Sequence, residues 1–451
     1  MPSVRGLNVQ RLRQLATGGT ASIAVSVAAT NVLRIVSSMT LTRLLDAHAY
    51  GVVGVITSIA YMLAMLADVG LYGFIVRHAE GDDPTFLDQV WTLRLIRGAA
   101  LAALMIVVAH PAAALLGKPE LGPVVAIWSL SFLLDGLASL AFATAVRGRQ
   151  LWRLSFLDLS ANVTTLVVSI GFALALRSYW ALVIGMLAGA VAKSILSYVL
   201  FPATRRRWHF NRARSTELWR FSRFIALSSM LSLLILQSDK LVLARLMPLS
   251  AYGLYAIAVT LAAAPGALAA PYATRVLFAT YSKTFRTNPE ALRTVFYSAR
   301  RKVALLYMFL VGGMLGAAPL IIGVLYDPRY RGVIPFFQLI CISAILRMSS
   351  LPANEAMIAV GRMRATFFAN VCRVIWLAIG GGIGLWTGNI MLLIAIVGTV
   401  EVPGMLCYWL FLRQSKLLSL REEGYGLAAG AVGIGLGWLV SAGVLEIFPA
   451  L

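Results

Sequence analysis

The chain has 451 residues, of which 60% are hydrophobic and only 13% are charged. About a quarter of the residues in a soluble domain are charged, so this composition nearly excludes a soluble enzyme and favours a polytopic helical membrane protein. Lysine and arginine outnumber aspartate and glutamate by 39 to 18, which gives a net charge of +21. In a soluble protein this charge would suggest nucleic-acid binding, whereas in a membrane protein it can reflect the orientation of the chain in the membrane.

Apolar runs bounded by charge, glycine or proline predict about thirteen spanning helices. In chain order they lie at 20–44, 51–75, 90–110, 122–146, 154–177, 179–202, 221–246, 253–277, 301–325, 332–359, 365–387, 389–412 and 425–447. Ahead of them, residues 1–19 contain three arginines and lack a small-residue cleavage site. We expect this segment to be an uncleaved interfacial lead-in on the cytoplasmic side.

The distribution of lysine and arginine predicts the orientation. With the N-terminus inside, 26 of these residues fall on cytoplasmic segments, 6 on the opposite side and 7 within spans. Cytoplasmic loops of membrane proteins carry such an excess, so we expect a cytoplasmic N-terminus. The orientation of the chain in the membrane then accounts for most of the excess of basic residues, and no nucleic-acid partner is predicted.

Two stretches of the chain repeat each other. T-R-L-L-D-A-H-A-Y-G at 42–51 lines up with A-R-L-M-P-L-S-A-Y-G at 244–253. Six spans separate the copies, so the repeat is parallel and predicts two six-helix lobes around a central cavity, with 12–14 spans in all. The predicted parts of this all-α membrane protein are an N-lobe at 20–202, a basic linker at 203–220, a C-lobe at 221–412 and an extra C-terminal span within 413–451.

Motifs of catalysis and metal binding are missing from the sequence. The three cysteines and four histidines are scattered without C-x-x-C or other ligand spacing, and there is no G-x-S-x-G elbow and no P-loop. We therefore predict no enzyme activity, no metal site and no resident cofactor.

Four motifs resemble those of a known family. They are L-T-R-L-L-D-A-H-A-Y-G at 41–51, D-V-G-L at 68–71, R-G-R-Q-L-W-R-L-S-F at 147–156 and the second hairpin copy at 244–253. In order and spacing these motifs resemble the polysaccharide transport family, the Wzx-type flippases of the multidrug/oligosaccharidyl-lipid/polysaccharide superfamily. The resemblance covers the first twelve spans. Family members commonly have twelve or fourteen, so thirteen is a departure at the C-terminal end.

The resemblance implies a function. A protein of this kind moves a polyprenyl-pyrophosphate-linked oligosaccharide from the inner to the outer leaflet by alternating access, for exopolysaccharide, capsule or O-antigen assembly. It implies an H⁺ or Na⁺ gradient as driving force, and membrane lipid and polymerase or export machinery as further partners. One alternative is an ion-coupled drug antiporter of the same fold. Another is a membrane polysaccharide polymerase or glycosyltransferase, which the short non-cytoplasmic loops disfavour.

Charged residues within the predicted spans are the candidates for function. Each cation at a helix centre costs about 2.5–3.5 kcal/mol, so it should face a cavity, an acid or the interface. The cations are Arg34, Arg94, Arg97, Lys193, Lys240, Arg347 and Arg373, and the acids are Asp68, Asp135, Asp158, Asp239, Glu355 and Glu401. These numbers nearly balance, so a purely structural pairing of all of them is the alternative.

The repeat singles out two of the cations. At its offset, Lys240 corresponds to position 38, one helical turn after Arg34, so each lobe presents one cation on an equivalent face. We predict that Arg34 and Lys240 bind the pyrophosphate. Further substrate-binding candidates are Arg347, Arg373 and Arg97. For Arg94 and Lys193 we expect side chains that extend to the membrane interface.

Acids and prolines complete the set of candidates. Asp239, beside Lys240, is either a plain ion-pair partner or a protonatable or sodium-binding carboxylate. Asp135 lies at nearly the same depth in its lobe as Arg347 does in the other, which suggests a latch between lobes. The ion-coupling or gating candidates are thus Asp239, Asp135 and Asp68, and the hinge candidates, from helix-interrupting prolines, are Pro265, Pro271 and Pro352.

Overall fold

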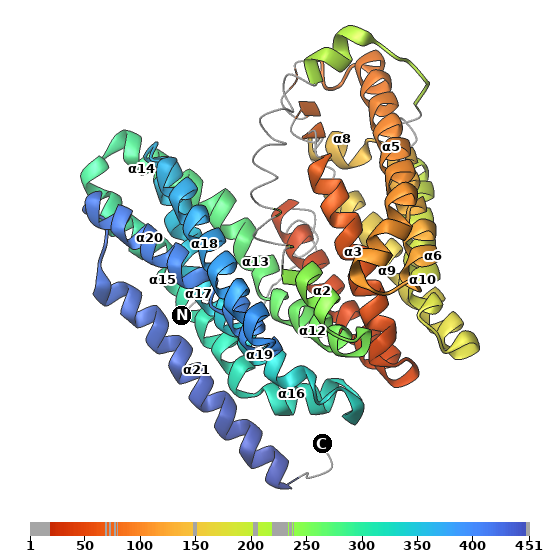
Figure 1. The fold of residues 1–451 in the computed structure, drawn as a ribbon. Helices are drawn as coiled ribbons and strands as arrows, with labels where there is room; N and C mark the ends of the chain where they lie inside the picture. Colours follow the sequence, from red (N-terminus) through yellow and green to blue (C-terminus); the bar gives the residue numbers. More distant parts are fainter. Residues whose placement is uncertain are drawn as a thin grey trace, which may run out of the picture. The chain divides into compact units, whose positions relative to one another are not determined.

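The chain folds into two compact units, residues 1–233 and 234–451. The computed structural model describes residues 19–447 except 68–69, 72–73, 76–77, 79, 148–150, 202–205, 219–232, 234–236 and 238. Every regular element in these residues is helical, as Figure 1 shows. The predicted all-α architecture is confirmed.

Unit 1 contains the first run of helices. These are α2 (Gly19–Leu44), α3 (Ala47–Leu66), α5 (Pro84–Leu116), α6 (Leu121–Trp128), α7 (Leu130–Leu137), α8 (Ala141–Arg147), α9 (Leu151–Leu176) and α10 (Trp180–Val199). The α2–α3 hairpin is the first copy of the repeat, and Asp46 caps α3 by accepting a hydrogen bond of 3.0 Å from the Ala49 amide. As the motif predicts, this copy ends one helix and begins the next.

The predicted single span at 122–146 is wrong, because the chain forms three short helices there, α6, α7 and α8. The second interruption, at residues 138–140, has an extended Ala138. Ser197 of α10 satisfies the backbone of Ser139, accepting from its amide at 3.0 Å. Two carbonyls of the same interruption accept from Arg94 of α5, as described below. Side chains distant in sequence thus stabilise the break.

Unit 2 contains the second run. After a helical stretch at 239–246 come α12 (Leu249–Ala263), α13 (Gly266–Pro271), the π-helix η2 (Tyr272–Leu277), α14 (Phe278–Thr287), α15 (Leu292–Gly316), α16 (Ala318–Leu325), α17 (Val333–Ala359), α18 (Arg364–Thr387), α19 (Ile390–Gly398), α20 (Glu401–Gln414) and α21 (Leu420–Ile447). The second copy of the repeat again ends one helix, at 246, and begins the next, α12.

Apolar helices long enough to cross a membrane occur in both units. Within the described residues there are eight, or nine if one bent pair forms a single span. The bent pair is α15 with α16, which turns by 72°, so the segment predicted as a span at 301–325 is not one straight helix. Pro319 lies in the first turn of α16 and lacks an amide proton, which explains why α15 does not continue. The predicted span at 221–246 lies largely outside the described residues. The chain is a multi-pass membrane protein.

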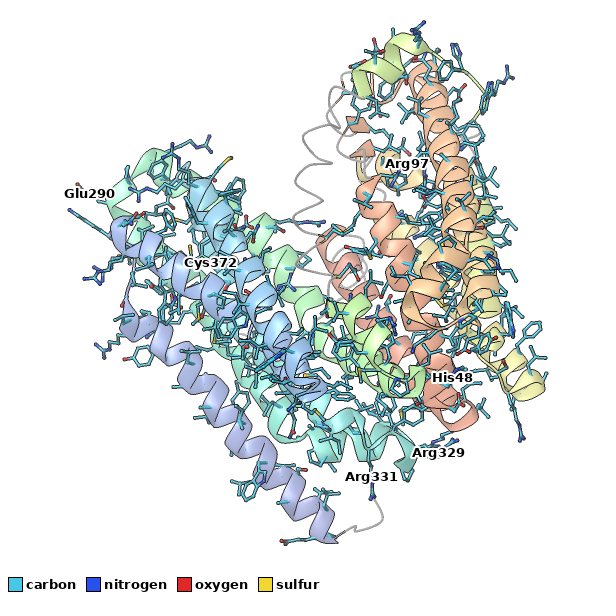
Figure 2. The ribbon with its side chains drawn as sticks, in the orientation of Figure 1. His48, Arg97, Glu290, Arg329, Arg331 and Cys372 are labelled. Carbon is cyan, nitrogen blue, oxygen red and sulfur yellow. The ribbon has the colours of Figure 1, made fainter. Side chains whose placement is uncertain are left out.

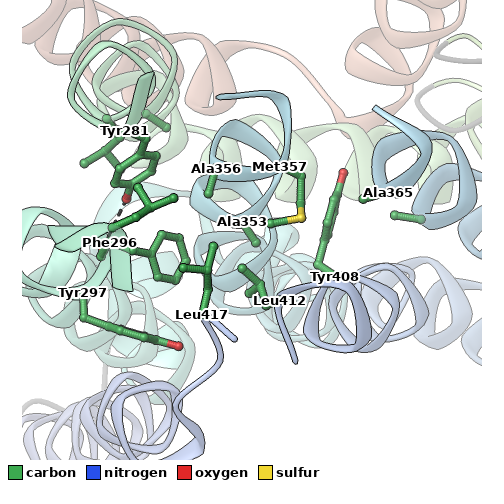
Figure 3. Close-up of a cluster of buried hydrophobic side chains, with 14 of the residues drawn as sticks. Tyr281, Phe296, Tyr297, Ala353, Ala356, Met357, Ala365, Tyr408, Leu412 and Leu417 are labelled. Atoms are coloured by element: carbon green, nitrogen blue, oxygen red, sulfur yellow. Dashed lines mark hydrogen bonds between the residues drawn. The ribbon is translucent and has the colours of Figure 1, made fainter. Parts of the chain in front are cut away.

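The core of unit 2 centres on the C-terminal half of α17 (Figure 3). Ala353, Ala356 and Met357 of this helix are fully buried. Around them pack aromatic and aliphatic side chains from α14, α15 and α20, which include Tyr281, Phe296, Tyr408 and Leu412. The small residues of α17 let these large side chains approach. The cluster joins α17 to these three helices and, through Ala365 and Ala369, to α18.

Helix α21 packs closely against α15 through glycines. A Cβ atom on Gly433 would fall on the carbonyl oxygen of Phe309, and one on Gly437 would fall on that of Gly313. At one end, Glu423 accepts from Arg300 in a buried ion pair, and the Tyr297 hydroxyl donates to the same carboxylate at 3.2 Å. The predicted extra C-terminal helix is therefore an integral part of unit 2.

We predict that Gly433→Ala destabilises the protein by about 2 kcal/mol, because the added methyl group overpacks the α15–α21 contact. The matched control is Gly435→Ala in the same helix, where a Cβ atom meets nothing within 4 Å. Thermal unfolding of both variants in detergent measures the difference. Equal melting temperatures for the two variants would show that the close helix contact does not form.

Candidate functional site

Unit 1 encloses a cavity of about 420 Å³ lined by α3, α5, α6 and α7. Arg94 on its wall is only 7% exposed. Its guanidinium donates to Asp135 at 2.8 Å and to the carbonyls of Ala138 and Ser139 at 3.3 and 3.1 Å. The expectation that Arg94 extends to the interface is wrong, because the broken helix supplies acceptors inside the unit.

Arg97 lies one turn further along α5 and lines the same cavity (Figure 2). Its guanidinium donates to the Ala64 carbonyl at 3.2 Å. Asp135, bound to Arg94, keeps 67% of its side chain exposed. The latch between Asp135 and Arg347, which belong to different units, stays a prediction.

Lys193 on α10 and Asp158 on α9 form an ion pair of 2.7 Å on the surface of unit 1. Both side chains are about half exposed. Lys193 therefore has a partner acid on the neighbouring helix. This pairing favours the structural alternative, in which the two charges only pair with each other.

Unit 2 contains a cavity of about 330 Å³, and among the described residues that line it Asp239 is the one charged side chain and the others are apolar. Its Oδ2 accepts a hydrogen bond of 2.5 Å from the Tyr255 hydroxyl. Its Oδ1 is buried and has no hydrogen-bond partner among the described residues. A carboxylate with one such oxygen can accept a proton or a cation. Sequence reasoning pairs Asp239 with Lys240 alone and misses Tyr255, whose only signal is its place two residues after the second A-Y-G.

Arg34 and Arg347 differ from the paired arginines. Each side chain is exposed, Arg34 on α2 of unit 1 and Arg347 on α17 of unit 2. Neither forms an ion pair with any described residue. Lys240 is half-buried beside Asp239. The prediction that Arg34 and Lys240 face one another concerns two separate units and stays a prediction.

Arg373 on α18 is buried, at 8% exposure. Its guanidinium donates to Glu401 of α20 at 2.7 Å and to Asn370 at 2.8 Å, and it lies 5.7 Å from the ring centre of Tyr408. A Cβ atom on Gly404 would lie 2.5 Å from its Nε, so the site has no spare room. This geometry favours the structural alternative for Arg373 over substrate binding.

The hinge candidates fall into different local structures. Pro265 separates α12 from α13, and Pro271 ends α13 where the π-helix begins. Helix α17 runs without interruption through Pro352. A π-helix is often found at functional positions, so the segment from Pro265 to Leu277 is the strongest of the three candidates. Asp68 lies outside the described residues, and the hinge roles stay predictions.

A cluster around Arg214 escaped the sequence analysis. Residues 206–218 of the basic linker pack on unit 1, where Arg214 donates to Glu80 and Glu217 at 2.6 Å each and covers the ring of Phe86 at 4.7 Å. Arg206 is almost fully buried 3.6 Å from Asp88. Burial lowers the pKa of the Arg206 guanidinium, and the Asp88 carboxylate opposes this shift. The linker therefore forms ion pairs with acids of unit 1.

Metal ligands do not gather in the described part of the chain. No group of three or more His, Cys, Asp or Glu side chains there could hold a metal ion.

Comparisons with known proteins identify a family and several relatives of this chain. The model of the family described as "Polysaccharide biosynthesis protein" matches residues 40–335. The chain is 25% identical over 387 residues to the lipopolysaccharide biosynthesis protein WzxC of Escherichia coli (strain K12), covering 82% of this chain and 76% of WzxC. It is also 25% identical over 316 residues to the succinoglycan biosynthesis transport protein ExoT of Rhizobium meliloti (strain 1021), covering 69% of this chain and 62% of ExoT.

Among solved structures, the fold resembles that of the lipid II flippase MurJ in an inward closed conformation. The TM-score is 0.72 and the identity 12%, covering 92% of this chain and 91% of MurJ. At this identity the likeness concerns the fold.

We predict that Arg373→Met and Glu401→Gln each destabilise the protein by about 3–5 kcal/mol, because each leaves the other charge buried and unpaired. The double variant should be markedly more stable than either single variant. Thermal unfolding of the three proteins in detergent, analysed as a double-mutant cycle, gives the coupling. Single variants of normal stability that fail only in substrate binding would instead place Arg373 in the binding site.

Proposed function

Because the chain belongs to the polysaccharide biosynthesis protein family, we propose that it is a flippase for a polyprenyl-pyrophosphate-linked oligosaccharide. It moves this lipid from the inner to the outer leaflet of the bacterial inner membrane by alternating access, with its N-terminus in the cytoplasm. The oligosaccharide that it delivers to the outer leaflet is used for exopolysaccharide, capsule or O-antigen assembly. Its partners are the lipid-linked glycan, membrane lipid and the polymerase or export machinery.

The observation that supports this proposal most strongly is the exposure of two arginines, Arg34 on α2 and Arg347 on α17. Two buried arginines of the spans each form an ion pair with an acid. These pairs are Arg94–Asp135 and Arg373–Glu401. Arg34 and Arg347 are exposed without such a partner in the described residues. A pyrophosphate supplies the missing negative charge, and arginine suits it because the guanidinium binds phosphate oxygens in a bidentate manner.

This charge distribution also separates the proposal from its alternatives. A drug antiporter for cationic compounds would need an accessible acid that is not already paired with a cation. The exposed acid of the unit 1 cavity, Asp135, is paired with Arg94, whereas exposed arginines suit an anionic head group. A polymerase or glycosyltransferase would need an active site at the membrane surface. Transport therefore fits the described residues better than catalysis.

Asp239 is the proposed site of ion coupling. Its Oδ1 has no partner within the described residues, and the other lining residues that the structure describes are apolar. When a pyrophosphate binds Lys240, the carboxylate loses its neighbouring positive charge, so its affinity for H⁺ or Na⁺ should rise. Substrate binding and ion binding then favour each other.

We predict that Arg34→Ala and Lys240→Ala each reduce glycan export at least tenfold while the protein stays inserted at normal amounts, because an anionic head group in a low-dielectric site needs fixed counter-charge. Surface glycan and membrane protein are quantified in a strain that depends on this chain. Arg331→Ala, an exposed arginine in the α16–α17 connection, is the matched control. Normal export by the Arg34→Ala, Lys240→Ala double variant would rule out this role.

The coupling proposal predicts that Asp239→Asn keeps normal amounts of protein and still binds the lipid-linked glycan, but no longer responds to an imposed H⁺ or Na⁺ gradient in reconstituted vesicles. The asparagine preserves the size of the side chain and can still accept from Tyr255. A purely structural role predicts a lower amount of protein instead. Gradient-dependent flipping at the normal rate by Asp239→Asn would exclude the coupling role.

A further inference from the structure

The cavity of unit 1 contains more than its two arginines. Two aromatic rings line it from different helices, Tyr61 on α3 and Trp128 on α6. Tyr61 is 46% exposed and Trp128 is 8% exposed, so one ring is accessible and the other forms a fixed wall. Thr57 and Ser131 add hydroxyl groups to the lining.

The polar groups of the cavity are held in place by the surrounding structure. The Arg94 guanidinium donates to Oδ1 of Asp135 and also to two backbone carbonyls. The carboxylate of Asp135 is thereby oriented while most of its side chain remains accessible. Arg97 is anchored to the Ala64 carbonyl on the opposite helix, α3. The cavity therefore presents an oriented acceptor and an oriented donor at bilayer depth, where polar groups are costly and mark functional sites.

A sugar ring matches this combination. Its C–H faces are apolar and pack on aromatic rings, while its hydroxyl groups at the edge both donate and accept hydrogen bonds. A carboxylate accepts from such hydroxyls and a guanidinium donates to them. A hydrocarbon chain would make no use of the polar groups of Asp135 and Arg97, and a phosphate would make no use of the two aromatic rings. A cavity of about 420 Å³ also falls within the usual size of small-molecule sites.

We infer that this cavity is a binding subsite for a sugar residue of the lipid-linked oligosaccharide, with Tyr61 and Trp128 as the stacking surface and Asp135 and Arg97 as the hydrogen-bonding groups. The inference rests on the proposed function and adds to it a place where the glycan itself is recognised. It separates recognition of the sugar, in unit 1, from neutralisation of the pyrophosphate by Arg34 and Lys240.

The test compares two lipids on the full-length protein in nanodiscs by native mass spectrometry. One is synthetic polyprenyl pyrophosphate without sugar. The other is the lipid-linked oligosaccharide that accumulates in a strain lacking this chain. Tyr61→Ala should weaken binding of the glycan-bearing lipid about tenfold and change binding of the sugar-free lipid less than twofold. Tyr61→Phe, which keeps the ring, should retain most of the affinity, and Trp128→Phe should show a smaller selective loss.

Phe172→Ala is the matched control, because Phe172 lies in the same unit with a similar exposure of 40% and does not line the cavity. It should leave both affinities unchanged. If Tyr61→Ala weakens both lipids equally or neither, the sugar subsite is overturned and the proposed function stands. If the wild-type protein binds neither lipid, the proposed function itself fails, and this inference fails with it.

Discussion

The cost of a charge in the hydrocarbon core organises much of this protein. Each cation within a span must find an acid, a backbone carbonyl or a cavity. Inside unit 1, Arg94 finds an acid and two carbonyls at once, and inside unit 2, Arg373 finds Glu401 and Asn370. These contacts join helices far apart in sequence, so the requirement to neutralise charge also fixes how the helices of each unit pack.

The same requirement distinguishes paired from exposed cations. The paired arginines already donate hydrogen bonds to groups of their own unit. Arg373 also has no room beside it for a ligand. Arg34 and Arg347 are exposed, so their charge is available to an anion that enters from outside the protein. The sequence alone could not make this distinction, because cations and acids nearly balance in number and partners such as Glu401 lie 28 residues from the arginine they bind.

Long apolar runs made most spans predictable, and the helices at α9, α17 and α18 begin and end close to the predicted bounds. The interruptions were not predictable in the same way. The break at 138–140 depends on Arg94 and Ser197, which lie more than 40 residues away in either direction. The contact between Tyr255 and Asp239 likewise joins two helices across the second hairpin, and hydropathy contains no information about such a bond.

The ion pair of Arg373 also bears on the cavity of Asp239. Arg373 and Val374 are consecutive on α18, so when the arginine is fixed against α20, the next residues along the helix turn toward Asp239. Val374, Leu377, Ala378, Gly381 and Leu385 line that cavity at the spacing of one helical face. The rotation of α18 about its axis, set by Arg373 and Glu401, therefore determines the apolar surroundings of the acid. Arg373 thus helps to shape the surroundings in which Asp239, under the proposed function, would bind its ion.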